Sequence, residues 1–243
     1  MPTETTSEAV PLGRFHRPSD AEALPGLVLV HDVWGPSEHS HDLAADWARE
    51  GFGVLEIDLY RDLGDVAIED VGAWIRGLSD PDVIADLEAG ADWLTNESTA
   101  CRGRPVGITG VCMGGMFTLL AACHSDRFTA AAPFYGMLSY DEGMLAEEGG
   151  RDLSRKPASP IECAERLRCP TLASFGCEDG FIPDAHVDAL EAGFAKSGQR
   201  YEIDRHEAAG HAFLNRTRAE AYREDASAAA WARVVPFLHE TLA

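Results

Sequence analysis

Short apolar runs alternate with longer amphipathic segments along most of this chain. The apolar runs predict strands over residues 26–31, 52–58, 105–109, 130–135, 171–175 and 200–204. The intervening segments predict helices over residues 40–50, 81–94, 116–122, 161–167, 185–195 and 219–242. This alternation, with strands apolar on both faces, is typical of a mostly parallel, doubly wound sheet covered by helices on both faces. The predicted fold class is α/β, with functional residues at the carboxyl ends of strands.

The whole chain, residues 1–243, is expected to form a single domain. Its length suits one α/β unit, and an apolar content of 45% is enough for a sizeable core. The segment 137–168 is long for a connection between strands and is rich in Glu, Gly and Pro. It is interpreted either as a lid over a binding site or as a long solvated loop that carries the helix at 161–167.

The sequence Gly110-Val111-Cys112-Met113-Gly114-Gly115 lies between a predicted strand and a predicted helix. This is the spacing of a nucleophile elbow, in which small neighbours allow a sharp turn that exposes one side chain. Serine usually fills the central position, so Cys112 would supply an intrinsically better nucleophile. The alternative interpretation is that Cys112 is a small buried residue beside glycines that serve only packing.

Two later residues could complete a catalytic group with Cys112. Asp179 follows the strand at 171–175, and His211 follows the strand at 200–204. Each has an ordinary explanation, because an Asp in a turn often caps it and a His beside Gly is often a surface residue. The chain order of nucleophile, acid and base is nevertheless the order of α/β-hydrolases, and three such residues at strand ends are hard to explain by packing.

Together these segments resemble the dienelactone hydrolase family over nearly the whole chain. The resemblance implies an α/β-hydrolase fold and a triad of Cys112, His211 and Asp179. Such a triad hydrolyses esters or lactones through an acyl-thioester intermediate. The motifs that carry the resemblance are residues 31–35, 57–60, 110–115, 134–136, 179–183 and 210–213.

The remaining catalytic groups are expected around the elbow. The backbone N–H groups of Met113 and Val33 are predicted to form the oxyanion hole. By resemblance, an acidic residue in the loop after the first parallel strand controls the thiol proton. The family usually has Glu there, whereas this chain has the shorter Asp32, for which a turn cap is the alternative role.

Substrate recognition departs from the family pattern. Founding members bind an anionic dienelactone through arginines, one of them four residues after the catalytic His, and that position here is Asn215. The region where another such arginine is expected offers only Arg61. We therefore expect a neutral ester, lactone or thioester. The aromatic residues beside the catalytic loops, expected to bind substrate, are Trp34, Tyr135 and Phe213, together with Phe181. Packing in the core is the alternative role for such aromatic residues.

The charge balance excludes some partners. With 41 acidic and 20 basic residues the net charge is -21, and only Lys156 and Lys196 are lysines. Such a surface argues against nucleic acid and anionic membranes, so a small-molecule substrate is the expected partner, and a homodimer is left open. An acid-rich, lysine-poor surface also suits a saline cytoplasm.

No cofactor or metal site is expected. The polar N-terminal segment and the lack of a long apolar run predict a cytoplasmic protein, in which the six cysteines are reduced thiols. His39-Ser40-His41 has metal-ligand residue types, but residues two apart diverge on a helix and no third ligand is evident. This segment is interpreted as surface.

One competing function uses the same scaffold. A non-hydrolytic thiol protein would employ Cys112 as a redox or covalent sensor. It would need an activated thiol but would have no use for Asp179.

Overall fold

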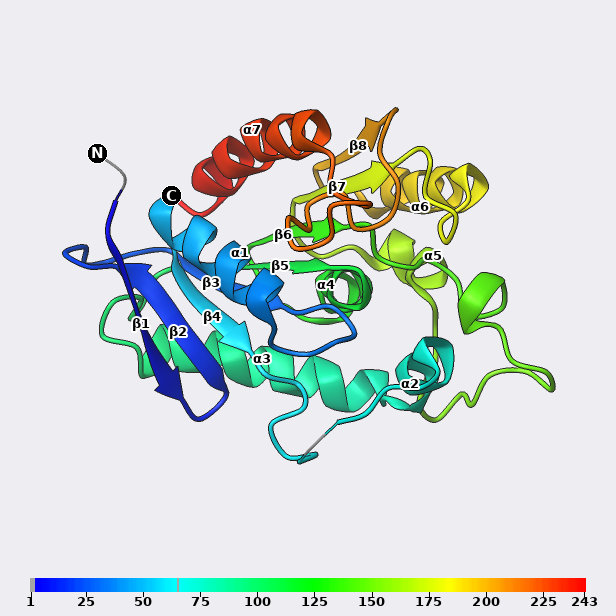
Figure 1. The fold of residues 1–243 in the computed structure, drawn as a ribbon, viewed down its shortest axis with the longest axis horizontal. Helices are drawn as coiled ribbons and strands as arrows, with labels where there is room; N and C mark the ends of the chain where they lie inside the picture. The colour runs from blue at the N-terminus through cyan, green and yellow to red at the C-terminus, as the bar shows by residue number, and fades with distance from the viewer. Residues whose placement is uncertain (1–2, 65) are drawn as a thin grey trace.

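In the computed structural model, which describes residues 3–64 and 66–243, a single eight-stranded sheet forms the centre of the molecule (Figure 1). The strand order is β1-β2-β4-β3-β5-β6-β7-β8. The strands β3 to β8 all run parallel to one another, whereas β2 pairs antiparallel with both β1 and β4. The strands are β1 Thr5–Val10, β2 Gly13–Pro18, β3 Gly26–Val30, β4 Gly53–Ile57, β5 Val106–Val111, β6 Ala130–Phe134, β7 Thr171–Gly176 and β8 Tyr201–His206.

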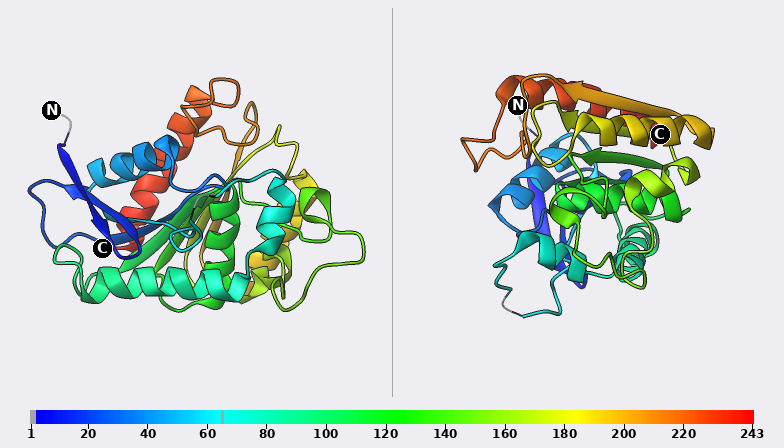
Figure 2. Two further views of the ribbon diagram at one scale, coloured as in Figure 1. Left: turned by 60° about the horizontal axis from the view of Figure 1, so that its bottom comes forward. Right: turned by 90° about the vertical axis from the view of Figure 1, so that its right-hand side faces the viewer.

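Helices cover both faces of this sheet. Figure 2 shows α1 and α7 on one face, while α3 and α4 pack on the other. The helices are α1 Glu38–Arg49, α2 Val71–Gly77, α3 Asp80–Asn96, α4 Met113–His124, α5 Pro160–Cys163, α6 Asp184–Ser197 and α7 Glu224–Thr241, with short 3₁₀ turns η1 Gly143–Leu145 and η2 Ala164–Arg166. The predicted α/β class with a mostly parallel, doubly wound sheet is confirmed.

The central strands are buried because both of their faces are covered. Every residue of β3, β4 and β5 is buried, as is nearly all of α4, which packs on β5 and β6 beside α3. These are the segments whose apolar runs predicted them most clearly. Within the described ranges, no helix combines the length and the apolar character needed to cross a membrane.

The sequence analysis missed the N-terminal hairpin β1–β2 and the short helix α2. Most of β1 is exposed at the edge of the sheet, so its sequence is polar and lacks the alternation that predicts a strand. Helix α2 has only seven residues, and its beginning is defined by Asp70, which accepts a hydrogen bond from Ala73 N at 2.9 Å. The last helix begins at Glu224 rather than at residue 219, because residues 215–222 form successive turns.

The segment 137–168 is fastened to the start of α3. Lys156 and Asp80 are both buried, and Lys156 Nζ lies 2.5 Å from Asp80 Oδ1. Tyr140 donates a hydrogen bond to the other carboxylate oxygen at 2.8 Å, and the ammonium lies over the Phe117 ring at 5.2 Å from its centre. Burial lowers the pKa of Lys156 and raises that of Asp80, with each charge partly offsetting the effect on the other. This segment is therefore a long, anchored loop in the structure, and its role as a lid remains a prediction.

Replacing Lys156 tests this anchor. We expect Lys156→Met to lower the free energy of unfolding by about 3–5 kcal/mol, because it leaves the Asp80 carboxylate buried without its partner. Urea denaturation followed by far-UV circular dichroism measures the change. The matched control is Lys196→Met, since Lys196 is exposed and lies 4.0 Å from Glu165. Equal stability of the two variants would contradict this account.

Candidate functional site

The loops that follow the parallel strands meet at the carboxyl edge of the sheet. Asp32 follows β3, Cys112 follows β5, Asp179 follows β7 and His211 follows β8. The chain turns from β3 to its neighbour β4 on one side and later adds β5 on the other, so a crevice is expected outside the ends of β3 and β5. Asp32 and Cys112 are at this position.

The turn at Cys112 has the geometry of a nucleophile elbow. Cys112 has φ 56° and ψ -119°, a conformation that non-glycine residues rarely adopt. The backbone of α4 approaches the sheet so closely that a Cβ on Gly114 would lie 2.2 Å from Val30 O, and one on Gly110 would lie 2.5 Å from Gly114 O. The glycines are thus required by packing, and the Cys112 side chain is partly exposed. The predicted strand, sharp turn and helix are confirmed.

Asp179 orients His211. The Nδ1–H of His211 donates a hydrogen bond to Asp179 Oδ2 at 2.8 Å, and the other carboxylate oxygen accepts one from Phe181 N at 2.9 Å. Asp179 is buried, with 6% of its surface exposed. The arrangement fixes the orientation of the imidazole, leaving Nε2 as its second functional nitrogen.

The pKa of His211 is raised to about 10. Burial alone would lower it, but hydrogen bonding to Asp179 and to Cys112, with the negative charges of both groups, outweighs that effect. At neutral pH His211 is therefore an imidazolium. A cation at this position stabilises a thiolate in the free protein.

Aromatic side chains surround the His211 ring. Tyr135 and Phe181 each contact it edge-on, with ring centres 5.2 and 5.1 Å away, and Phe213 packs against Tyr135. Tyr135 and Phe213 are buried, whereas 50% of Phe181 and 55% of Trp34 are exposed. Of the aromatic residues expected to bind substrate, Tyr135 and Phe213 form the packed wall behind His211, and Trp34 and Phe181 are open to solvent.

The two expected oxyanion-hole donors are free. Met113 is the first residue of α4, so its N–H has no partner within the helix. Among the described residues no hydrogen bond occupies the backbone N–H of Val33. The positive end of the α4 dipole adds to the stabilisation of negative charge beside Cys112.

Tyr60 and Trp74, whose roles the sequence analysis missed, hold the Val33 loop. The Tyr60 hydroxyl donates to Val33 O at 2.9 Å and also contacts Met113 Sδ at 3.5 Å. Trp74 Nε1 donates to the same hydroxyl at 2.9 Å. Burial raises the pKa of Tyr60, which keeps the phenol neutral and able to donate. Tyr60 stood in a motif of the resemblance, but nothing local indicated its partners.

His31 connects the loops after β3 and β4. Its Nδ1–H donates to Asp32 O at 2.6 Å, and its Nε2 accepts from Leu59 N at 3.2 Å. The pKa of this fully buried ring is lowered by burial, so it remains neutral and keeps one tautomer. His31 therefore fixes the loop that carries Asp32 and Val33.

Asp32 is buried, with its Oδ1 accepting a hydrogen bond from Trp34 N at 2.9 Å. This bond is the turn cap that the sequence analysis named as one alternative. The carboxylate also lies close enough to the site that its charge, like that of Cys112, contributes to raising the pKa of buried Tyr135. A turn role and a catalytic role are thus compatible at this position.

The polar residues considered for anion recognition are engaged elsewhere. Arg61 makes two hydrogen bonds to Asp86, at 3.0 and 2.8 Å. Asn215 is buried and its Oδ1 accepts from Thr217 N at 3.0 Å, which makes it a turn residue. Arg216, which follows Asn215 and is the next basic residue after His211, pairs with Asp46 of α1.

The interpretation of residues 39–41 as surface was wrong for His39. Only 6% of His39 is exposed, and burial lowers its pKa. His39 lies on the buried face of α1, together with Leu43 and Trp47, which follow it at helical spacing. His41 lies on another side of the helix, with 46% of its side chain exposed.

Comparisons with known proteins identify the family of the chain. The model of the dienelactone hydrolase family matches residues 13–242. A Salmonella typhimurium protein named "Putative carboxymethylenebutenolidase" is 30% identical over 228 residues, covering 91% of this chain and 79% of that protein. Carboxymethylenebutenolidase of Rhodococcus opacus is 30% identical over 237 residues, covering 96% and 87%.

A solved structure agrees as well. The crystal structure described as "Putative Dienelactone Hydrolase" from Klebsiella pneumoniae superposes with a TM-score of 0.84 and 27% identity, covering 98% of each chain. The family match spans nearly the whole sequence, and the fold agrees with it. The chain therefore belongs to the dienelactone hydrolase family, has the α/β-hydrolase fold and is an ester or lactone hydrolase.

Proposed function

We propose that this enzyme cleaves a neutral ester or lactone through an acyl-thioester on Cys112, with His211 and Asp179 as the other members of the triad. The observation that carries the proposal is the strained, accessible Cys112 beside an imidazole held by a buried carboxylate at 2.8 Å. Strained backbone that the surrounding packing maintains is typical of functional sites. Tyr135 and Ala212, which neighbour the site, also have positive φ.

The proposed reaction has two halves. The Cys112 thiolate attacks the substrate carbonyl carbon, a C–S bond forms, and the oxyanion accepts hydrogen bonds from Val33 N and Met113 N. Collapse breaks the C–O bond, and His211 gives its proton to the leaving oxygen. Water then loses a proton to His211 and attacks the thioester, which releases the acid and the thiolate. With a lactone, the alcohol and the acid are parts of one product.

The pKa of His211 suits both halves. In the free enzyme Asp179 and Cys112 both raise the pKa of the imidazole, which prepares it to act as an acid. Acylation removes the thiolate charge, and with it the Cys112 contribution that raises this pKa. The imidazole then becomes a better base when water must be activated.

The contacts of Arg61 and Asn215 favour a neutral substrate. Arg61 is paired with Asp86 and Asn215 holds a turn, so neither offers a bidentate clamp for a carboxylate. The net charge of -21 opposes the approach of an anion. We assign substrate contact to the exposed rings of Trp34 and Phe181, and we assign to Tyr135 and Phe213 the positioning of His211.

Removing the thiol tests the nucleophile. Cys112→Ala should lower turnover of a p-nitrophenyl ester by about 10⁴-fold or more, because no other group can form the acyl-enzyme. Its melting temperature should stay near that of the wild type, since the lost side chain is small and partly exposed. The control is Cys177→Ala at the exposed cysteine, which should retain full activity. Substantial ester hydrolysis by Cys112→Ala would contradict the assignment of Cys112 as the nucleophile.

Neutralising Asp179 separates a hydrolase from a thiol sensor. Asp179→Asn should reduce turnover by about 10⁴-fold, by analogy with the same change in a serine triad, because an amide cannot stabilise the imidazolium of His211. Alkylation of Cys112 by iodoacetamide should persist, since the α4 dipole still acts on the sulfur. Glu178→Gln, at the exposed neighbouring carboxylate, should behave as wild type in both assays. A thiol sensor has no need of Asp179, so the reactivity of its thiol would be the same in both variants. Hydrolysis by Asp179→Asn at a rate near that of the wild type would refute the triad.

We also propose that Asp32 governs the charge of the thiol. Asp32→Asn removes a negative charge but can still accept the hydrogen bond from Trp34 N. Because a nearby negative charge disfavours a thiolate, the rise of Cys112 alkylation with pH should move to lower pH by about one unit. Asp58→Asn is the matched control, since Asp58 makes the same turn bond to Tyr60 N at 2.9 Å after the adjacent strand. If the pH dependence of Cys112 alkylation is identical in Asp32→Asn and the wild type, Asp32 is only a turn cap.

A further inference from the structure

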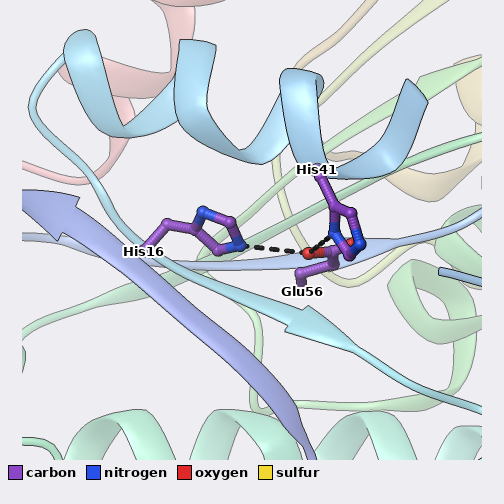
Figure 3. A group of neighbouring side chains, drawn as sticks. All are labelled: His16, His41 and Glu56. Atoms are coloured by element: carbon purple, nitrogen blue, oxygen red, sulfur yellow. Dashed lines mark hydrogen bonds and ion pairs between the residues drawn. The ribbon is translucent and has the colours of Figure 1, made fainter. Parts of the chain in front are cut away.

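A carboxylate is buried in the middle of the sheet, away from the triad. Glu56 lies in β4 with only 1% of its surface exposed, in a strand whose other residues are glycine or apolar. Its Oε2 accepts hydrogen bonds from His16 Nε2 at 3.0 Å and from His41 Nδ1 at 2.8 Å (Figure 3). The side chains come from three elements, β2, α1 and β4, which are far apart in the sequence.

Hydrogen bonds within the cluster leave one buried atom without a partner. Glu56 Oε1 is inaccessible to solvent, and among the described residues no donor makes a hydrogen bond to it with good geometry. The Ser40 side chain lies close enough to Glu56 to contribute to lowering its pKa, but its hydroxyl donates to Ser37 O at 3.1 Å. Burial raises the pKa of Glu56, but the bonds from His16 and His41 outweigh it, so the pKa is lowered and the carboxylate stays charged. An ionised oxygen without a partner inside a protein is costly, and such atoms require an explanation.

The three side chains have the donor types and the spacing of a transition-metal site. Two imidazole nitrogens and a carboxylate oxygen are ligands that Zn²⁺ and similar divalent ions use in proteins. One ligand atom from each residue lies within 4.8 Å of the others. Around a tetrahedral zinc the ligand atoms are about 3.3 Å apart, so the observed nitrogen–oxygen separations of 3.0 and 2.8 Å need to widen by only a few tenths of an ångström.

We propose that His16, His41 and Glu56 form a binding site for a divalent transition-metal ion of the zinc class, which ties the β1–β2 hairpin and α1 to β4. Each histidine would offer the nitrogen that now donates to Glu56, with its proton on the other nitrogen. The carboxylate would use its unpartnered Oε1, its Oε2 or both. Because 46% of the His41 side chain is exposed, water can enter from that side to complete the coordination.

The location indicates a structural role. The β1–β2 hairpin is the edge of the sheet, and β1 is mostly exposed, so little apolar packing fastens it. His16 is in the strand that joins this edge to β4, opposite Val54 in the register. An ion bound by all three elements would stabilise the folded state by binding it in preference to the unfolded chain.

Metal binding to the purified, chelator-treated protein tests this proposal. Zn²⁺ is titrated by calorimetry, and Co²⁺ is followed by its visible absorption. Because a thiolate beside an imidazole can itself bind zinc, the titrations are done on both the wild type and Cys112→Ala. The site variant is His41→Gln, which can still donate a hydrogen bond to Glu56 and changes a half-exposed position, so it is expected to fold. The matched control is His186→Gln, where His186 Nε2 lies 2.8 Å from Glu142 and the described residues offer no third ligand.

The expected result is one equivalent of Zn²⁺ bound by Cys112→Ala, with affinity lowered tenfold or more by adding His41→Gln and unchanged by adding His186→Gln. At a free metal concentration a hundredfold above Kd, the melting temperature should rise by about 5–10 °C. At the same metal concentration, adding His41→Gln should reduce this rise to about half or less. Co²⁺ bound at this site should give no sulfur-to-metal absorption band. Absence of saturable binding to Cys112→Ala, or binding that His41→Gln leaves unchanged, would overturn the proposal.

Discussion

The close approach of α4 to β3 is the constraint on which the site depends. Gly114 lies so near Val30 O and His31 O that no side chain fits between them. This contact forces the turn at Cys112 into its strained conformation and brings the start of α4 beside the loop after β3. One packing requirement thus leaves the thiol partly exposed and brings the start of α4 against the end of β3.

The loops around this contact are held by polar side chains that take no part in bond making. His31 ties the loop after β3 to Leu59, and Tyr60 ties the same loop to Trp74 and the Met113 side chain. Each of these groups is buried or partly buried and kept neutral by burial, so its hydrogen bonds are strong and directional. Backbone donors must be preorganised to stabilise an oxyanion, so this network suits the role proposed for Val33 and Met113.

Charge is buried at several places in this acidic protein, each time with a different partner. Asp179 is neutralised by the imidazolium of His211, and Asp80 by Lys156, one of only two lysines in the chain. Glu56 is stabilised by two histidines, whose bonds leave its other oxygen without a hydrogen-bond partner in the part of the chain that the structure describes. Isolated buried charges are too costly to persist, so each of these carboxylates specifies a contact between distant segments.

Local patterns in the sequence determined the alternating strands and helices, the elbow at Cys112 and the chain order that selected Asp179 and His211. Apolar periodicity and glycine spacing act over a few residues, and strand ends in a parallel sheet meet at one edge. Only the tertiary structure decided that Tyr135 and Phe213 are packed behind His211 and that Arg61 is paired with Asp86.

The polar hairpin β1–β2 and the cluster of His16, His41 and Glu56 were likewise settled by tertiary structure. A charged residue within an apolar strand was the one local sign of that cluster, and it named no partner. Residues 15 to 40 positions apart meet only when the sheet closes against α1. Short-range patterns in the sequence cannot predict such contacts, because the free energy of the contacts arises from burial and pairing in the folded chain.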